Sequence, residues 1–196
     1  ASEEHNKRNS NRTIEESLEN FKAMASQVKG VKMTLAMACA LGSPFGDDVP
    51  ADRVKYLCEE AFKVGVTRIG LGDTAGISNP AHTKDIIRAL KSICDISQID
   101  VHLHDAYGMG LANAYAAVEE GVTSLDAAAG GLGGCPFVPG AKGNIATEDL
   151  VHMLQALGYD TGYDLDKILS TVRSMCEEIQ AVPTSSLIQA RKCHQG

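Results

Sequence analysis

The stretch D-V-H-L-H-D-A-Y-G, residues 100–108, begins as a short apolar run and carries two histidines and an aspartate near its centre. If residues 99–104 form a strand, His102 and His104 project from the same face, while the apolar residues that alternate with them face the other way. Two neutral imidazoles side by side at a strand end can share one metal ion. The same pattern also fits a pair of hydrogen-bonded histidines at the rim of a core, and H-x-H alone does not separate the two interpretations.

Apolar runs and helical patterns alternate on both sides of this stretch. Four short apolar runs are centred near residues 35, 69, 101 and 125, and a segment of helical periodicity follows each of them. The predicted helices cover residues 51–64, 81–93, 109–120 and 147–157, with a last one at 164–179. Spacings of roughly 25 to 35 residues are typical of right-handed βα units, so the sequence predicts a parallel sheet.

The first thirty residues add one more predicted helix. Residues 2–11 are polar and are predicted to form a loop. Thr13 is a candidate N-cap, and Glu16 three residues later completes a capping box. Apolar residues then recur at helical spacing until Gly30 ends the segment.

Two architectures place parallel strands in this order: a doubly wound open sheet and a (β/α)₈ barrel. Both put polar residues at the carboxyl ends of strands. A dinucleotide-binding sheet would carry its glycine-rich loop after the first strand, whereas here that loop, residues 130–144, follows the last one. We therefore favour a (β/α)₈ TIM barrel. A full barrel needs about 250 residues, so we expect residues 1–196 to be the C-terminal portion of a single barrel domain whose N-terminal strands are missing.

Composition excludes several classes of partner. The formal net charge of −7 argues against a nucleic-acid-binding or polybasic membrane-binding surface. The six cysteines contain no C-x-x-C pair, which indicates free thiols in a reducing compartment rather than a disulfide framework. No apolar run is long enough for a signal peptide or a membrane span.

The glycine-rich loop presents two further candidates. Cys135 lies between Gly134 and Pro136 and is a candidate catalytic thiol, although a cysteine is more often a small buried hydrophobe. Asn144 precedes the predicted helix at 147–157, and its amide could cap that helix or bind a metal. From the residues alone, the cap is the favoured role.

Six segments, in this order, resemble the 3-hydroxy-3-methylglutaryl-CoA lyase family. They are S-E-E-H-N-K-R-N, A-C-A-L-G-S-P-F, L-G-D-T-A-G, H-L-H-D-A-Y-G-M-G-L-A-N, G-G-L-G-G-C-P-F and G-N-I-A-T-E-D-L. The H-x-H-D motif is shared with the related metal-dependent synthases, and G-G-L-G-G-C-P is specific to the lyase branch. The resemblance covers nearly the whole chain.

The resemblance implies roles for six residues. The metal ligands would be His102, His104 and Asn144, and the catalytic residues would be Cys135, Asp73 and Glu148. The family's remaining ligand, an aspartate beside a substrate-contacting arginine on the first strand, has no counterpart in these residues. A mixed set of nitrogen and oxygen ligands suits Mg²⁺ or Mn²⁺ better than a closed structural zinc site.

The activity implied by the resemblance is metal-assisted cleavage of 3-hydroxy-3-methylglutaryl-CoA to acetyl-CoA and acetoacetate. The implied partner is an acyl-CoA substrate, with a homo-oligomer as the expected assembly and no nucleic acid or membrane. The expected location is the cytoplasm of a bacterium or the mitochondrial matrix of a eukaryote. Two alternatives stay open: another metal-dependent aldolase or acyl-CoA condensing enzyme of this superfamily, and an inactive fragment.

Overall fold

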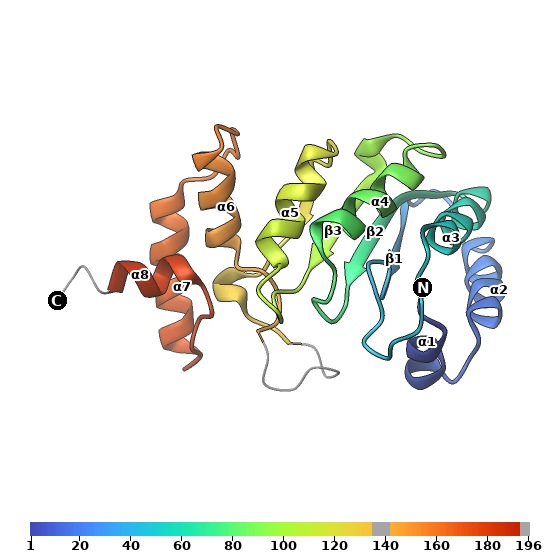
Figure 1. Cartoon of the computed structure of the whole chain (residues 1–196), viewed down its shortest axis with the longest axis horizontal. Coiled ribbons are helices and arrows are strands. Elements are labelled where there is room, and N and C mark those ends of the chain that lie inside the picture. The colour runs from blue at the N-terminus through green and yellow to red at the C-terminus, as the bar shows by residue number, and fades with distance from the viewer. Residues whose placement is uncertain (135–141, 193–196) are drawn as a thin grey trace.

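The computed structural model describes residues 1–134 and 142–192, and its centre is a sheet of four parallel strands in the order β1-β2-β3-β4. The strands are β1 (Met33–Met37), β2 (Val66–Asp73), β3 (Ile99–Leu103) and β4 (Ser124–Asp126). Each strand is followed by a helix: α3 (Ala51–Lys63), α4 (Pro80–Leu90), α5 (Gly110–Glu119) and α6 (Thr147–Ala156). Figure 1 shows these units following one another across the molecule in chain order. The predicted βα repeat is confirmed.

The two faces of the sheet differ because side chains alternate along each strand. On β2 and β3 the face under the helices carries Ile69, Leu71, Val101 and Leu103, all fully buried. The opposite face carries polar or small residues, including Gly72 and His102 of adjacent strands. A parallel sheet whose helices all cover one face matches the wall of a barrel, in which the helices form an outer ring.

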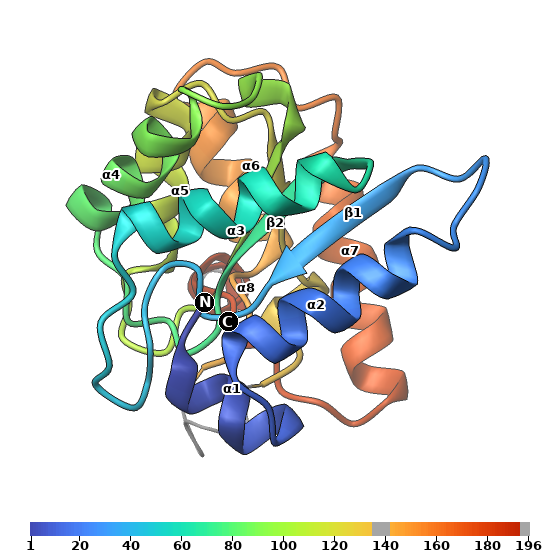
Figure 2. The same cartoon turned by 90° about the vertical axis from the view of Figure 1, so that its right-hand side faces the viewer.

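The N-terminal residues form two helices beside β1, as Figure 2 shows from that end of the molecule. They are α1 (Glu3–Ser10) and α2 (Ile14–Ala25). The predicted capping box is present, since the Glu16 N–H donates to Thr13 Oγ1 at 3.1 Å and the Thr13 N–H donates to Glu16 Oε2 at 2.8 Å.

The prediction of a loop at residues 2–11 is wrong. Ser2 caps α1 by accepting the His5 N–H at 3.0 Å, and the Glu3 N–H donates to Asp47 Oδ2 at 3.0 Å. Most residues of α1 are polar, so the helix has little apolar periodicity to reveal it. Its first turn is instead held by a carboxylate more than forty residues away.

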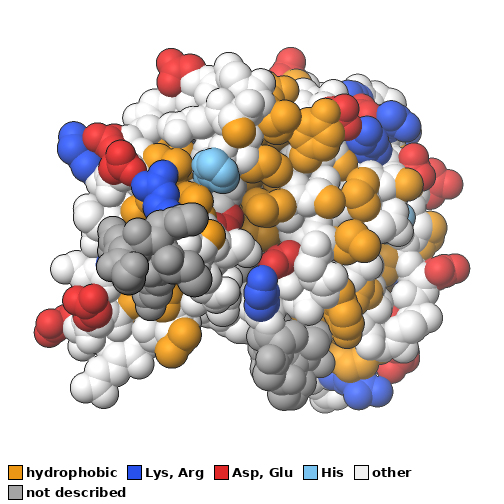
Figure 3. All heavy atoms as spheres, turned by 60° about the vertical axis from the view of Figure 1, so that its left-hand side comes forward, with side chains coloured by type: hydrophobic (Ala, Val, Ile, Leu, Met, Phe, Trp, Pro, Cys, Tyr) orange, Lys and Arg blue, Asp and Glu red, His pale blue; other side chains and the backbone are white. Residues whose placement is uncertain are grey.

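The C-terminal helices α7 (Leu165–Glu178) and α8 (Ser186–Lys192) pack against each other around a second, smaller apolar cluster. Asp149 of α6 joins α8 to α6 by accepting the Ser186 N–H at 2.8 Å and the Leu187 N–H at 2.9 Å. Figure 3 views this end of the molecule and shows apolar side chains near the middle of the face, with most charges toward its margins. None of the helices described is long and apolar enough to cross a bilayer.

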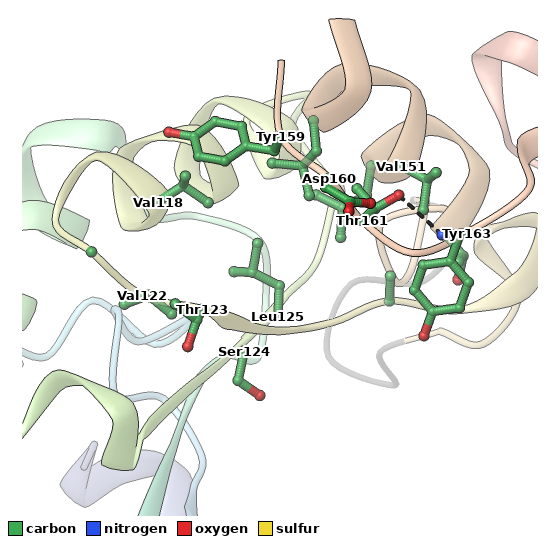
Figure 4. A pocket seen from close by; sticks show the side chains of 15 residues that line it. Val118, Val122, Thr123, Ser124, Leu125, Val151, Tyr159, Asp160, Thr161 and Tyr163 are labelled. Atoms are coloured by element: carbon green, nitrogen blue, oxygen red, sulfur yellow. Dashed lines mark hydrogen bonds between the residues drawn. The ribbon is translucent and has the colours of Figure 1, made fainter. Parts of the chain in front are cut away.

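A groove of about 720 Å³ runs between β4, the end of α5 and α6. Its lining includes Leu125, Leu150 and Leu154, and Tyr159 and Tyr163 stand on opposite sides of it (Figure 4). β4 is the last strand of the sheet, so no further named strand fills this space among the described residues. Neither His102 nor His104 lines the groove, which separates it from the candidate site.

Candidate active site

The two histidines of the H-x-H motif face each other at the carboxyl end of β3. His102 Nε2 and His104 Nε2 are 3.3 Å apart, and the ring centroids are separated by 5.2 Å. The expectation that both rings project from one face is therefore confirmed. β3 lies between β2 and β4, and His102 is in register with Gly72 on one side and Asp126 on the other.

The surroundings of His104 favour the neutral imidazole that a metal requires. His104 is only 8% exposed. This burial, and to a smaller extent the proximity of His102, lowers the pKa of His104 below its ordinary value near 6.5. A neutral ring keeps a lone pair available at neutral pH, so no proton has to be displaced before a cation binds.

His102 is more exposed, and a carboxylate lies near it. Its side chain is 43% exposed, and its Nδ1 lies 3.5 Å from Asp126 Oδ2 on β4. A carboxylate beside Nδ1 favours the tautomer whose Nε2 is free to bind a metal, which is the usual partner arrangement for ligating histidines. Sequence reasoning missed Asp126, because only the strand register places it beside His102.

Asn144 reaches the histidines through a short extended segment. The Asp105 N–H donates to the Gly143 carbonyl at 2.8 Å, the Ile145 N–H donates to the Leu103 carbonyl at 3.1 Å, and a β-bridge pairs His104 with Asn144. The Asn144 Nδ2 donates to the Leu132 carbonyl at 2.8 Å. Its Oδ1 is buried and has no hydrogen-bond partner in the described part of the chain. A buried amide oxygen without a donor is uncommon in a folded protein, and a cation would satisfy it.

The prediction, from the residues alone, that Asn144 caps the following helix is wrong. The N-cap of α6 is Ala146, which makes no side-chain cap hydrogen bond. The chain stays extended through residue 146 because it pairs with the sheet, and Asn144 is thereby left two residues outside the helix boundary.

Asp73 closes a turn next to the site. Its carboxylate is fully buried, accepts the Ile77 N–H at 3.0 Å and the Ser78 N–H at 3.3 Å, and so ties the loop after β2 to the strand end. Asp73 is in register with Leu103, whose side chain faces the helices, rather than with His102. The structure therefore does not group its carboxylate with the imidazoles.

The turn that Asp73 holds packs against the chain that follows His104. Gly76 has a φ of +66°, and a Cβ at this position would lie 2.8 Å from the backbone nitrogen of Ala106 and 3.1 Å from the carbonyl oxygen of His104. Only glycine permits both the left-handed conformation and this approach. The link between Asp73 and the chain around His104 therefore runs through the backbone of this turn.

Glu148 holds the glycine-rich turn on the other side. It lies in the first turn of α6, is fully buried, and accepts the Gly130 N–H at 3.1 Å through Oε2. Its Oε1 has no hydrogen-bond partner among the described residues. Cys135, the predicted catalytic thiol, lies outside the residues that the structure describes.

Asp100, two residues before His102 on β3 and on the same face of the sheet, takes part in an ion pair. Arg68 of β2 donates to both carboxylate oxygens of Asp100, with Nε 2.9 Å from Oδ2. The hydrogen bond from Arg68 lowers the pKa of Asp100 below its ordinary range. The two-pronged contact ties β2 to β3 and fixes the register that carries His102.

The donor set at this edge is two imidazoles and one amide oxygen. Within residues 1–134 and 142–192, no three His, Cys, Asp or Glu side chains are grouped to hold a metal. A cation bound by His102, His104 and Asn144 would therefore keep coordination positions for oxygen atoms from water or a substrate. That is the open, nitrogen-and-oxygen site that suits Mg²⁺ or Mn²⁺.

Fold and site together define a barrel-type α/β chain with a candidate metal centre at the carboxyl edge of its sheet. The chain belongs to the HMGL-like family, whose model matches residues 1–175. It is 38% identical to the mitochondrial hydroxymethylglutaryl-CoA lyase of Gallus gallus over 192 residues, which are 97% of this chain and 64% of that protein. It thus spans about three fifths of the length of the curated relatives that it matches.

Solved structures agree. The HMG-CoA lyase of Bacillus subtilis superposes with a TM-score of 0.89 at 37% identity, over 97% of this chain and 65% of that one. The lyase of Acinetobacter baumannii, solved with coenzyme A and 3-methylmalate, superposes with a TM-score of 0.89 at 37% identity, over 96% and 62% of the two chains. The predicted fold class is confirmed: the four parallel strands are part of a (β/α)₈ barrel.

The burial of Asp73 makes stability depend on pH. Burial raises the pKa of Asp73 from about 3.8 to about 6. The folded state thus prefers the protonated acid, so the unfolding free energy falls as pH rises from about 4 through about 6, by roughly 2 to 3 kcal/mol from this group. We expect Asp73→Asn to remove this fall, as measured by urea unfolding at pH 4, 5, 6 and 7.

The matched control is Asp85→Asn, because the Asp85 side chain is 67% exposed on α4. Its unfolding free energies should run parallel to those of the wild type across the same pH range. Parallel curves for Asp73→Asn as well would contradict the effect of burial on this carboxyl.

Proposed function

We propose that this chain carries the metal-binding edge of a hydroxymethylglutaryl-CoA lyase, which cleaves 3-hydroxy-3-methylglutaryl-CoA to acetyl-CoA and acetoacetate. One observation carries the proposal: two imidazole Nε2 atoms 3.3 Å apart beside a buried amide oxygen without a donor. They lie at the carboxyl edge of a barrel sheet, where barrel enzymes place their chemistry. The relatives named above, one of them solved with coenzyme A, support the acyl-CoA substrate.

His102, His104 and Asn144 would hold a divalent cation, Mg²⁺ or Mn²⁺. Such an ion supplies a Lewis acid and a template for the oxygen atoms of the substrate. The neutral state of His104 and the Asp126 carboxylate beside His102 prepare both rings for this task.

The protein's own residues would transfer the protons of the reaction and position the loops around it. Loss of the proton from the tertiary hydroxyl allows the alkoxide to collapse to a ketone, which breaks the carbon–carbon bond and expels the thioester enolate. We assign Cys135 to proton transfer in this step: as base, its thiolate would accept the hydroxyl proton, and as acid, its thiol would protonate the enolate carbon to give acetyl-CoA. Asp73 and Glu148 serve as positioning residues, because each buried carboxylate holds the backbone of a loop that borders the site.

The direct test is acetoacetate release from 3-hydroxy-3-methylglutaryl-CoA, after chelation and again after addition of Mn²⁺. We expect release only with the metal, and a loss of about 10²- to 10⁴-fold in kcat for Cys135→Ala, the range typical of general acid–base groups. The matched control is Cys94→Ala, since Cys94 is a half-buried thiol in the turn after α4.

Two outcomes would contradict this proposal in different ways. Full turnover by Cys135→Ala would remove the cysteine from the mechanism and leave the lyase activity in place. No acetoacetate from a protein that binds Mn²⁺ would keep the metal site and point to another acyl-CoA or 2-oxo acid. A similar fold is known with such a ligand. The carboxyl transferase domain of Rhizobium etli pyruvate carboxylase, solved with 3-bromopyruvate, is similar with a TM-score of 0.61 at 25% identity over 81% of this chain.

Asp126 provides a test of the metal ligands that does not require turnover. We expect Asp126→Ala to weaken Mn²⁺ binding about tenfold, because His102 loses the partner of its Nδ1. Titration calorimetry would measure this dissociation constant, with Asp85→Ala on α4 as the control. An unchanged dissociation constant for Asp126→Ala would show that this carboxylate does not orient the ring.

A further inference from the structure

Helix α5 carries a fully buried amide side chain, Asn113, to which the proposed mechanism gives no role. Its Nδ2 donates to the Ser78 carbonyl at 3.0 Å, and its Oδ1 has no hydrogen-bond partner among the described residues. Burying an amide with one of its polar atoms unpaired reduces stability. A leucine of similar size would avoid this penalty, so packing alone does not account for an asparagine here.

The residue that Asn113 contacts belongs to the turn built on Asp73. The Ser78 N–H donates to Asp73 Oδ2 at 3.3 Å, and Ser78 Oγ lies 3.0 Å from Thr83 Oγ1 on α4. The Ser78 carbonyl accepts from Asn113. Ser78 is therefore bonded to the end of β2, to α4 and to α5, and the Asn113 amide supplies the bond to α5.

The same turn lies against the backbone of a candidate metal ligand. Gly76, two residues before Ser78, approaches the chain so closely that a Cβ there would lie 3.1 Å from the His104 carbonyl oxygen. Movement of the turn would therefore be felt at His104, because a close-packed contact transmits a displacement. The bond from Asn113 to Ser78 restrains that movement from the side of α5.

The first turn of α5 also contacts the segment that carries Asn144. A Cβ at Gly110, three residues before Asn113, would lie 2.4 Å from Ile145 Cγ2 and 3.0 Å from Asp105 Oδ1. Residues three apart are neighbours on one side of a helix. One side of α5 thus meets both the turn beside His104 and the residue that follows Asn144, so this helix connects the backbone around two of the three candidate ligands.

We propose that Asn113 is a positioning residue for the metal centre: by holding the turn at residues 73–78 against α5, its amide keeps His104 in place relative to Asn144. The inference rests on the proposed function, because it concerns the same metal site. Asn113 touches neither the metal nor the substrate and acts through the backbone of Ser78 and Gly76.

The test measures metal affinity in a variant that loses the donor and keeps the volume. We expect Asn113→Leu to weaken Mn²⁺ binding about tenfold, the lower end of the effect seen when a group that supports metal ligands is removed. Titration calorimetry would give the dissociation constant, at a temperature where urea unfolding shows the variant to be fully folded.

A conservative variant should restore the affinity. A carboxyl at this buried position is protonated at about pH 6, because burial without donors raises its pKa. Its O–H can then donate to the Ser78 carbonyl as the amide does. We expect Asn113→Asp to bind Mn²⁺ about as well as the wild type at that pH, where Asn113→Leu stays about tenfold weaker.

Asn6→Leu is the matched control for a general loss of stability. The Asn6 Nδ2 also donates to backbone carbonyls, those of Arg12 and Thr13, each at 2.8 Å, and these bonds join α1 to the start of α2. Losing them should lower the unfolding free energy measured in urea. The dissociation constant of Mn²⁺ should match that of the wild type, because these bonds do not reach the turn at residues 73–78.

Three results would overturn the assignment: wild-type affinity for Mn²⁺ in Asn113→Leu, equal weakening in Asn113→Leu and Asn113→Asp, and equal weakening in Asn6→Leu. If Asn113→Leu does not fold, Asn113→Ser takes its place, because its hydroxyl is too short to reach the Ser78 carbonyl. Failure of the proposed function is seen separately in the wild type, as absence of Mn²⁺ binding or of acetoacetate release.

Discussion

The pairing of residues 143–146 with the end of β3 is the constraint on which the candidate site depends. The backbone hydrogen bonds from Asp105 to Gly143 and from Ile145 to Leu103 bring a segment forty residues downstream onto the edge of the histidine strand. A third bond, from the Ala128 N–H to the Ile145 carbonyl at 3.0 Å, joins the same segment to the chain after β4. Without these bonds, Asn144 would have no fixed relation to His104.

Several buried polar groups around this segment reduce the stability of the folded chain. A buried amide oxygen lacks a donor, a fully buried carboxyl holds a turn at Asp73, and a second carboxylate at Glu148 has one oxygen without a partner. Buried polar groups in this state reduce stability unless something compensates them. A cation bound at the histidine pair would supply the partner that the Asn144 amide oxygen lacks, which is why we connect that oxygen with function.

Much of the fold could be predicted from the sequence, since four apolar runs and the helical patterns after them carry the period of each element. The site could be predicted only in part. The two histidines are neighbours in sequence, so a strand puts them on one face, and family resemblance supplied Asn144. The position of Asp126 beside His102 depends on the register between β3 and β4, and the first turn of α1 depends on a contact with Asp47. Both are long-range contacts that local patterns do not encode.

The most direct test of the central claim is the location of Mn²⁺ by anomalous diffraction from crystals soaked in the metal. The account predicts an anomalous peak within bonding distance of His102 Nε2, His104 Nε2 and Asn144 Oδ1. A protein that takes up Mn²⁺ elsewhere, with these three atoms unliganded, would contradict it.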